Sequence, residues 1–186
     1  LAMELARKAV REATEQQAAE AIDAARADLK NRRVAYEGRL QAVLESVQAN
    51  DIETEFVQVG GRPLQGCTAC MECKENQDRR CAITKDKLNE YLEKMIEADG
   101  IVVGSPTYFA DVSAETKALL DRCCFVALQN GGLFRGKVGA GVVAARRGGA
   151  IHVMDSILKP FQMSEIYMPG SKYSNMCYGL APADGT

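Results

Sequence analysis

A short, wholly apolar run, Ile101-Val102-Val103-Gly104, constrains the fold more than any other feature of this chain. Apolar residues repeat at helical spacing before it, over 88–96, and a helix is expected after it, over about 113–128. A strand without polar side chains that lies between two helices is typical of the middle of a parallel sheet. A second such run follows at 137–145, and another helix is expected at about 153–161.

Two shorter segments complete the expected alternation of strands and helices. Residues 53–59 alternate polar and apolar side chains and predict a strand, and residues 165–168 predict another. Thr84 or Asp86 is expected to cap the helix that begins near residue 88, and Ser113 is expected to cap the next one. This order of elements predicts an α/β fold with a doubly wound parallel sheet.

The beginning of the chain has a different composition. Residues 1–30 are rich in Ala, Glu, Gln, Arg and Lys and contain no Gly or Pro, so a long helix is expected there. We assign 1–37 to an N-terminal helical segment and 38–186 to the α/β domain. The thin apolar stripe of this added helix is expected to pack on its own domain, and joining two chains is the alternative.

One loop, residues 66–81, carries four cysteines. They are Cys67, Cys70, Cys73 and Cys81. Three cysteines in steps of three residues let one loop surround a single centre, and a fourth thiolate can close its shell. An iron-sulfur cluster is the favoured occupant. A zinc ion, and free thiols or a redox disulfide, are the alternatives.

Charge and cysteine usage exclude several classes of protein. The formal net charge of −2 gives no global attraction to nucleic acid or to an anionic membrane. No stretch is apolar and long enough to span a bilayer, and the first residues do not resemble a signal peptide. Seven cysteines, an odd number, suit a reducing compartment better than a disulfide framework. We therefore expect a soluble, cytoplasmic protein without nucleic-acid or membrane partners.

Two further loops follow the apolar strands, where ligands bind in open parallel sheets. The first, Ser105-Pro106-Thr107-Tyr108-Phe109, combines a stiffened turn with two aromatic rings and can hold a flat polar ring. The second, Ala145-Arg146-Arg147-Gly148-Gly149, brings backbone amides and guanidinium groups that could meet a carbonyl-bearing or anionic ligand. Both loops leave the carboxyl ends of neighbouring strands, so we expect them to face one crevice.

Other polar and sulfur-bearing residues are expected to have structural roles. The single histidine, His152, is expected at the surface or at a helix end. Asp121 and Arg122 are predicted to form an ion pair with each other. The three cysteines outside the loop are expected to be small buried hydrophobic residues. They are Cys123, Cys124 and Cys177.

The chain resembles, over about residues 40–182, the flavodoxin-like NADPH-dependent FMN reductases, and among them the iron-sulfur flavoproteins. The resemblance depends mainly on the strand-loop-helix segment from Ala98 to Arg122, and also on the segments 136–139, 146–149 and 175–179. It implies that the loop 105–109 lies against an FMN ring and that the four loop cysteines hold a 4Fe-4S cluster. It also implies NAD(P)H or a small redox carrier as electron donor, and assembly into a homo-oligomer.

The resemblance departs from the family pattern before Leu40. The family opens with an apolar strand and a Ser/Gly/Asn/Thr-rich loop for the FMN phosphate, and residues 33–36 are the only remnant of such a strand. We expect the strands that begin near Glu53 and Ile101 to pair directly, with the helix from Leu1 covering the altered face. The alternatives are that residues 33–36 insert as a short strand or that a neighbouring chain supplies one. With direct pairing, FMN is expected to bind with micromolar or weaker affinity, because phosphate contacts supply much of a mononucleotide's affinity.

Two functions are compatible with these features of the sequence. The first is a redox flavoprotein that transfers electrons between NAD(P)H or a small carrier, FMN and a 4Fe-4S cluster. The second is a non-catalytic metal- or cluster-binding assembly module that has lost flavin binding.

Overall fold

The computed structural model describes residues 20, 23, 41, 45–170 and 176–178. The chain divides into two compact units, Leu1–Ala42 with Gly179–Thr186, and Val43–Tyr178, and the fold described below lies in the second. Glu20 and Asp23 have helical backbone. The rest of the predicted N-terminal segment, its border at 37 and the remnant strand 33–36 lie outside the described residues.

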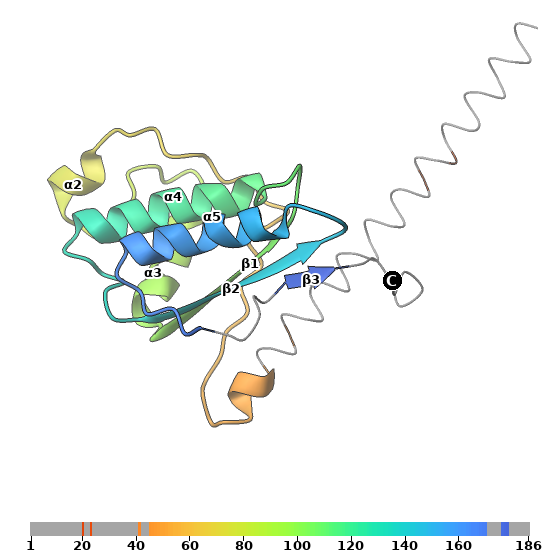
Figure 1. The fold of residues 1–186 in the computed structure, drawn as a ribbon. Helices are drawn as coiled ribbons and strands as arrows, with labels where there is room; N and C mark the ends of the chain where they lie inside the picture. Colours follow the sequence, from red (N-terminus) through yellow and green to blue (C-terminus); the bar gives the residue numbers. More distant parts are fainter. Residues whose placement is uncertain (1–19, 21–22, 24–40, 42–44, 171–175, 179–186) are drawn as a thin grey trace, which may run out of the picture. The chain divides into compact units, whose positions relative to one another are not determined.

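A parallel sheet forms the framework of this unit (Figure 1). Its strands are β1 (Gly100–Pro106), β2 (Val138–Ala145) and β3 (Met176–Tyr178), in the order β1-β2-β3. Gly100 lies opposite Val138 and Pro106 opposite Ala144, so β1 and β2 end at the same edge of the sheet. The two apolar strands predicted from the sequence are confirmed.

The helices whose bounds are described are α2 (Glu72–Asn76), α3 (Leu88–Glu97), α4 (Ala114–Gln129) and α5 (Ala150–Met163), and residues 45–48 are helical as well. The three longer ones confirm the helices predicted from periodicity, and α4 and α5 lie side by side over the sheet (Figure 1). Ser113 caps α4, because its Oγ accepts the Thr116 N–H at 3.3 Å. Asp86, rather than Thr84, accepts the first N–H of α3, from Leu88 at 3.2 Å.

Close packing of α5 on β2 depends on a missing side chain. A Cβ on Gly139 would lie 2.5 Å from the Ile166 Cγ2 and 2.8 Å from the Phe161 Cδ2, which no real contact allows. The helices and strands bury one apolar core between them. Its largest fully buried apolar side chains are Phe134, Phe161, Leu88, Leu92, Leu120, Ile157, Val126, Val143 and Val153.

Two predicted strands are wrong. Residues 53–59 form no strand, although Val57 and Val59 pack against the core. The alternating pattern correctly indicated which side chains face inward, but a strand also needs a neighbour with free backbone groups. The predicted direct pairing of this segment with β1 is therefore wrong as well. Residues 165–168 make only an isolated bridge, between Val138 and Tyr167.

The position of β1 also differs from the prediction. Its composition indicated the middle of a sheet, yet within the described residues β1 lies at one end of the strand order. Val102 on this strand and Val138 on β2 are exposed.

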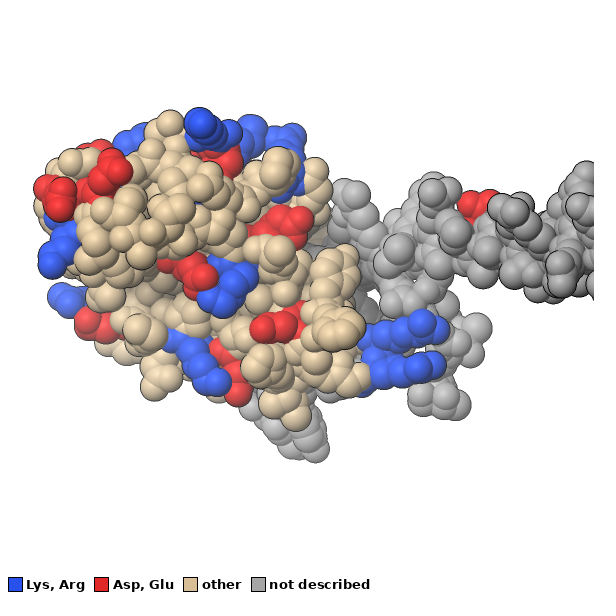
Figure 2. Space-filling model, turned by 90° about the horizontal axis from the view of Figure 1, so that it is seen from above, with Lys and Arg blue, Asp and Glu red and all other residues tan. Residues whose placement is uncertain are grey.

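The surface carries charges of both signs. Figure 2 shows Lys and Arg side chains interspersed with Asp and Glu on the face that it draws, with wide uncharged areas between them. Among the described residues, no helix has the length and apolar character needed to cross a membrane.

Candidate functional site

The loops that follow β1 and β2 touch each other. The Thr107 N–H donates to the Ala144 carbonyl at 2.7 Å. A Cβ on Gly149 would lie 2.8 Å from the Ala110 Cα and 3.1 Å from the Thr107 Cγ2, so glycine permits this close approach. The prediction that the two loops meet at one edge of the sheet is confirmed.

The first loop ends in a strained tight turn. The Tyr108 N–H donates to the Asp111 carbonyl at 2.8 Å, and the Asp111 N–H donates to the Tyr108 carbonyl at 3.1 Å. Phe109 and Ala110 between them have φ angles of 51° and 68°, the left-handed region that a type I′ turn requires. The Phe109 side chain is fully exposed and that of Tyr108 is largely exposed. An aromatic residue held in a costly conformation at a ligand-binding edge is a candidate contact for a flat ring.

Asp111 anchors this turn to α5. Its Oδ1 accepts the Val112 N–H at 2.7 Å and the Ser156 hydroxyl at 2.9 Å. Its Oδ2 lies 3.5 Å from the Nε2 of His152. These groups, the Val112 N–H first, hold the pKa of the Asp111 carboxyl below its usual value. His152 is exposed at the start of α5, which confirms the surface position predicted for it.

Some polar groups at this edge bond within the chain, and others show no hydrogen-bond partner among the described residues. The Ser105 hydroxyl accepts the Ser113 N–H at 3.0 Å and donates to the Pro106 carbonyl, so it shapes the loop. Within the described residues, the buried Thr107 Oγ1 has no hydrogen-bond partner. The N-cap of α5, Gly149, provides no side-chain cap for the first N–H groups of the helix. A buried hydroxyl and an uncapped helix start fit the carbonyl-rich edge of a flavin ring.

The loop 145–149, which follows β2, exposes its charged side chains. Arg146, Arg147 and Gly148 are exposed, whereas Ala145, the last residue of β2, is buried. Both guanidinium groups are therefore available to an anionic or carbonyl-bearing ligand at this edge.

The four cysteines of the 66–81 loop fall into two pairs. Cys67 and Cys70 are exposed, whereas Cys73 and Cys81 are buried, and all four are free of disulfides. The Ala69 N–H donates to the Cys67 Sγ at 3.4 Å. Ala69 has a left-handed φ of 53°, and such backbone turns direct N–H groups toward anionic centres, iron-sulfur sites included.

The sulfurs of this loop influence one another. Burial raises the pKa of the Cys73 thiol, and the thiols of Cys81, Cys70 and Cys67 raise it further. In the part of the chain that the structure describes, no three His, Cys, Asp or Glu side chains gather closely enough to hold a single metal ion. The loop offers four thiols, the number that a 4Fe-4S cluster or a tetrahedral zinc ion takes.

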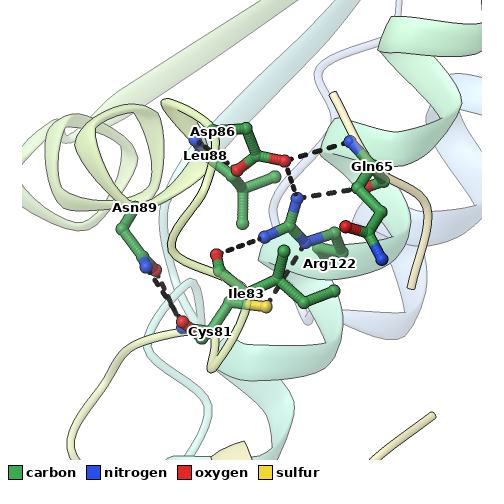
Figure 3. Close-up of polar contacts among 7 residues, drawn as sticks. All are labelled: Gln65, Cys81, Ile83, Asp86, Leu88, Asn89 and Arg122. Carbon is green, nitrogen blue, oxygen red and sulfur yellow. Dashed lines mark hydrogen bonds and ion pairs between the residues drawn. The ribbon is translucent and has the colours of Figure 1, made fainter. Parts of the chain in front are cut away.

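The buried guanidinium of Arg122, on α4, ties the loop to the core (Figure 3). Its Nε donates to the Cys81 Sγ at 3.3 Å. Its Nη1 donates to the Gln65 carbonyl at 3.0 Å and to the Asp86 carboxylate at 2.6 Å, and its Nη2 donates to the Ile83 carbonyl at 2.8 Å. Because Gln65 precedes the cysteines and the other partners end or follow the loop, one side chain joins both ends of the loop.

Asp86 completes this clamp. Besides Arg122, its carboxylate accepts the N–H groups of Gln65, at 3.0 Å, and Leu88. Burial alone would raise the pKa of the Asp86 carboxyl, but these hydrogen bonds, that of Arg122 foremost, lower it below its usual value. The predicted pair between Asp121 and Arg122 is wrong: α4 turns Asp121 toward Lys117 on its exposed face and Arg122 toward the core.

Two asparagines fix the buried cysteines through their backbone. The Asn89 side chain accepts the Cys81 N–H at 2.8 Å and donates to the Cys81 carbonyl at 2.9 Å (Figure 3). The Asn130 side chain donates to the Cys73 carbonyl at 3.0 Å and accepts the Arg79 N–H at 2.8 Å. Both cysteines therefore have their backbone held by the core before any ligand binds.

Two of the three cysteines outside the loop have described side chains, and both are at least partly buried. Cys123 is fully buried, and burial raises the pKa of its thiol well above the usual value. Cys124 is partly buried, and burial raises its pKa to about 11. The side chain of Cys177 lies outside the described residues.

Comparison with known proteins agrees with the fold and the loops. The family described as NADPH-dependent FMN reductase matches residues 36–177. An iron-sulfur flavoprotein of Methanocaldococcus jannaschii is 36% identical over 152 residues, which are 78% of this chain and 76% of that protein. An iron-sulfur flavoprotein of Archaeoglobus fulgidus is 35% identical over 129 residues, 68% of this chain and 65% of that protein.

A solved structure supports the same fold. The apo form of an NADH:FMN oxidoreductase superposes with a TM-score of 0.50 at 19% identity, over 74% of this chain and 65% of the other. The present chain thus spans less than two thirds of that oxidoreductase and of the Archaeoglobus protein. The parallel sheet and its paired loops define a flavodoxin-like α/β protein, as predicted. The chain belongs to the NADPH-dependent FMN reductase family, among the iron-sulfur flavoproteins.

Proposed function

We propose that this chain is a redox flavoprotein that transfers electrons between NAD(P)H or a small carrier, FMN and a 4Fe-4S cluster. The observation that carries the proposal is the four-cysteine loop, whose ends are clamped to the core by Arg122. A relative 36% identical to this chain is named an iron-sulfur flavoprotein, which supports the same assignment.

The cluster ligands in this proposal are Cys67, Cys70, Cys73 and Cys81. Cys73 and Cys81 are buried and held through Asn130 and Asn89, so they present fixed sulfurs on the core side. Cys67 and Cys70 are exposed and close the shell from the solvent side.

Bound FMN would supply the hydride-accepting and one-electron chemistry. The chain's own part is to hold and orient the ring: the Thr107 hydroxyl and the N–H groups at the start of α5 meet its polar edge, and Tyr108 and Phe109 cover its face. Arg146 and Arg147 offer positive charge at the same edge. The residues proposed to bind FMN are Ser105, Pro106, Thr107, Tyr108, Phe109, Ala145, Arg146, Arg147, Gly148 and Gly149.

The absorbance spectrum of the anaerobically purified protein tests both cofactors. FMN gives structured bands near ~450 nm and a 4Fe-4S cluster gives a broad shoulder near ~400 nm, as these cofactors do in general. Iron and sulfide analysis then identifies the ligands. Replacing Cys70→Ser is expected to remove most of the iron and sulfide, whereas Cys124→Ser, outside the loop, should retain them. Unchanged iron and sulfide in Cys70→Ser would contradict the assignment.

The second candidate is a metal- or cluster-binding assembly module without flavin. It is favoured by the composition of residues 1–39, which contain no Ser/Gly/Asn/Thr-rich run of the kind that holds a phosphate. Titration with FMN separates the candidates. No measurable binding supports the module, weak micromolar binding supports the flavoprotein with a reduced phosphate site, and nanomolar binding contradicts the expected loss of phosphate contacts.

The partners follow from the same chemistry. We propose a nicotinamide donor or a small redox carrier as partner, no nucleic acid or membrane, and a homo-oligomer in a reducing, cytoplasmic setting. Light scattering during size-exclusion chromatography measures the subunit count.

A further inference from the structure

We infer that Arg122 is a positioning residue for the cysteine loop, because it fixes the position of the Cys81 sulfur. By donating a hydrogen bond from a charged group, it also draws electron density from this sulfur, unlike those of the other three cysteines. The inference rests on the proposed function for its redox consequence. The positioning itself depends only on the contacts of the protein chain.

The burial of Arg122 shows how strongly its position is determined. The side chain is completely buried, and a buried guanidinium is stable only when its N–H groups are satisfied and its charge is paired. Asp86 provides the charge partner, and two carbonyls take two further hydrogen bonds. A fourth donor, the Nε N–H, is directed to the Cys81 Sγ. The planar fork of the guanidinium thus fixes where this sulfur lies.

The contact distinguishes Cys81 from the other cysteines of the loop. In the described part of the chain, Cys81 is the member of the four whose sulfur accepts a hydrogen bond from a charged side chain. Cys67 accepts one from a backbone N–H instead. Hydrogen bonds and positive charge at ligand sulfurs raise the reduction potential of a bound cluster. The hydrogen bond from Arg122 is therefore expected to favour the reduced state of a bound cluster. It should also draw the added electron density toward the part of the cluster that Cys81 would hold.

The first measurement needs no cofactor. The full-length, metal-free, reduced chain is treated with iodoacetamide, and alkylation of each cysteine is followed by peptide mass spectrometry. In Arg122→Lys, which keeps a charge but loses the fork, Cys81 is expected to react about ten times faster than in the wild type. The fully buried Cys123 serves as an internal marker of folding and should remain unreactive.

The second measurement is the reduction potential of the cluster-loaded protein. Arg122→Lys is expected to shift the potential to a more negative value. Lys117→Gln is the matched control, because Lys117 lies on the exposed face of the same helix and pairs only with Asp121 among the described contacts. It removes one positive charge from α4 without touching the loop, so its potential should equal that of the wild type.

A second variant tests the inference if Arg122→Lys does not fold. If Cys123 also becomes reactive in Arg122→Lys, Arg122→Gln is the second variant, because its amide N–H groups can still donate to Asp86 or a carbonyl while its shorter side chain loses the Nε donor to Cys81. The same two outcomes are expected for it.

Unchanged reactivity of Cys81 in a folded variant would overturn the inference. Faster reaction without a shift in potential would also overturn it, because Arg122 would then have a structural role alone. If the wild-type chain takes up no iron and sulfide, the proposed function fails, and the alkylation of Cys81 alone decides the inference.

Discussion

Phe109 and Ala110 have left-handed backbone conformations, which residues other than glycine rarely adopt. Each such residue carries about 1–2 kcal/mol of strain. The turn persists because its ends bond to each other and because Asp111 is held by Ser156 of α5. Strain of this kind is retained where a side chain is needed at one place, and here that side chain is an exposed aromatic ring.

Glycine substitutions separate the strain from the ring. Phe109→Gly and Ala110→Gly should each raise the free energy of unfolding by about 0.5–1 kcal/mol, because relief of strain exceeds the entropy that glycine adds to the unfolded chain. Only Phe109→Gly should weaken FMN binding, about two- to tenfold, since it alone removes an aromatic contact. Urea denaturation and FMN fluorescence titration measure the two effects. Equal FMN affinity in both variants would show that the ring does not contact the flavin.

At the scale of elements, α4 connects both halves of the site. Its N-cap, Ser113, donates its N–H to Ser105 at the end of β1. Its middle supplies Arg122 to the cysteine loop, and Asn130, its C-cap, holds Cys73. One helix thus contacts both the loop that follows β1 and the two buried cysteines.

Removal of the α4 cap tests this role. Ser113→Ala should lower the free energy of unfolding by about 1 kcal/mol, because the Thr116 N–H loses its acceptor. The matched control is Lys87→Ala, at the N-cap of α3, because the Lys87 side chain makes no cap bond and only an exposed ion pair with Glu90. That change should stay within about 0.5 kcal/mol. Urea unfolding curves measure both, and equal losses would show that the Ser113 bond does not stabilise α4.

The sequence predicted the elements whose signal is local. Helical periodicity marked α3, α4 and α5, and apolar runs marked β1 and β2, because these elements bury the residues that define the pattern. The strand predicted over 53–59 was wrong because an alternating pattern describes one segment alone. A strand also needs a neighbouring strand to which its backbone can hydrogen-bond. β3 was missed for the same reason: three residues carry little pattern, and their strand identity comes from pairing with β2.

The sequence identified the candidate cofactor-binding residues, but not the side chains that hold the cysteine loop in place. Cysteine spacing and the two loops identified the site residues, whose binding roles stay predictions. Arg122 was assigned to a pair with its sequence neighbour, because an arginine in a helix usually faces solvent. One signal was present: Leu119, Cys123 and Val126 lie on the same helical face as Arg122 and are buried. A basic residue inside an apolar stripe indicates a buried charge and therefore a distant partner.

For the whole molecule, the Arg122–Asp86 pair links stability to pH. The pKa of Asp86 is lower in the folded chain than its usual value of 3.8. The stabilisation from its ionised form is therefore complete above the pKa of the unfolded state and is lost as pH falls through the folded pKa.

Asp86→Asn tests this linkage. At neutral pH it should lower the free energy of unfolding by about 3–5 kcal/mol, because it leaves the buried Arg122 charge without its counter-ion. Below about pH 4 the wild type should approach the variant, since its own carboxylate becomes protonated. Asp155→Asn, in an exposed pair with Lys159, is the control and should cost less than about 1 kcal/mol. A constant difference between wild type and Asp86→Asn from pH 7 to pH 3 would contradict the linkage.

The joined ends of the cysteine loop also determine the order in which the protein matures. In small zinc-dependent domains the metal organises the chain, so the metal-free form is unfolded. Here Asp86, Arg122 and the two asparagines bind main-chain and side-chain groups of the protein, and a metal is not needed for these contacts. We therefore expect the chain to fold first and to receive its inorganic group last, through the side where Cys67 and Cys70 face solvent. Oxidative loss of that group would then leave an intact scaffold that can be reloaded.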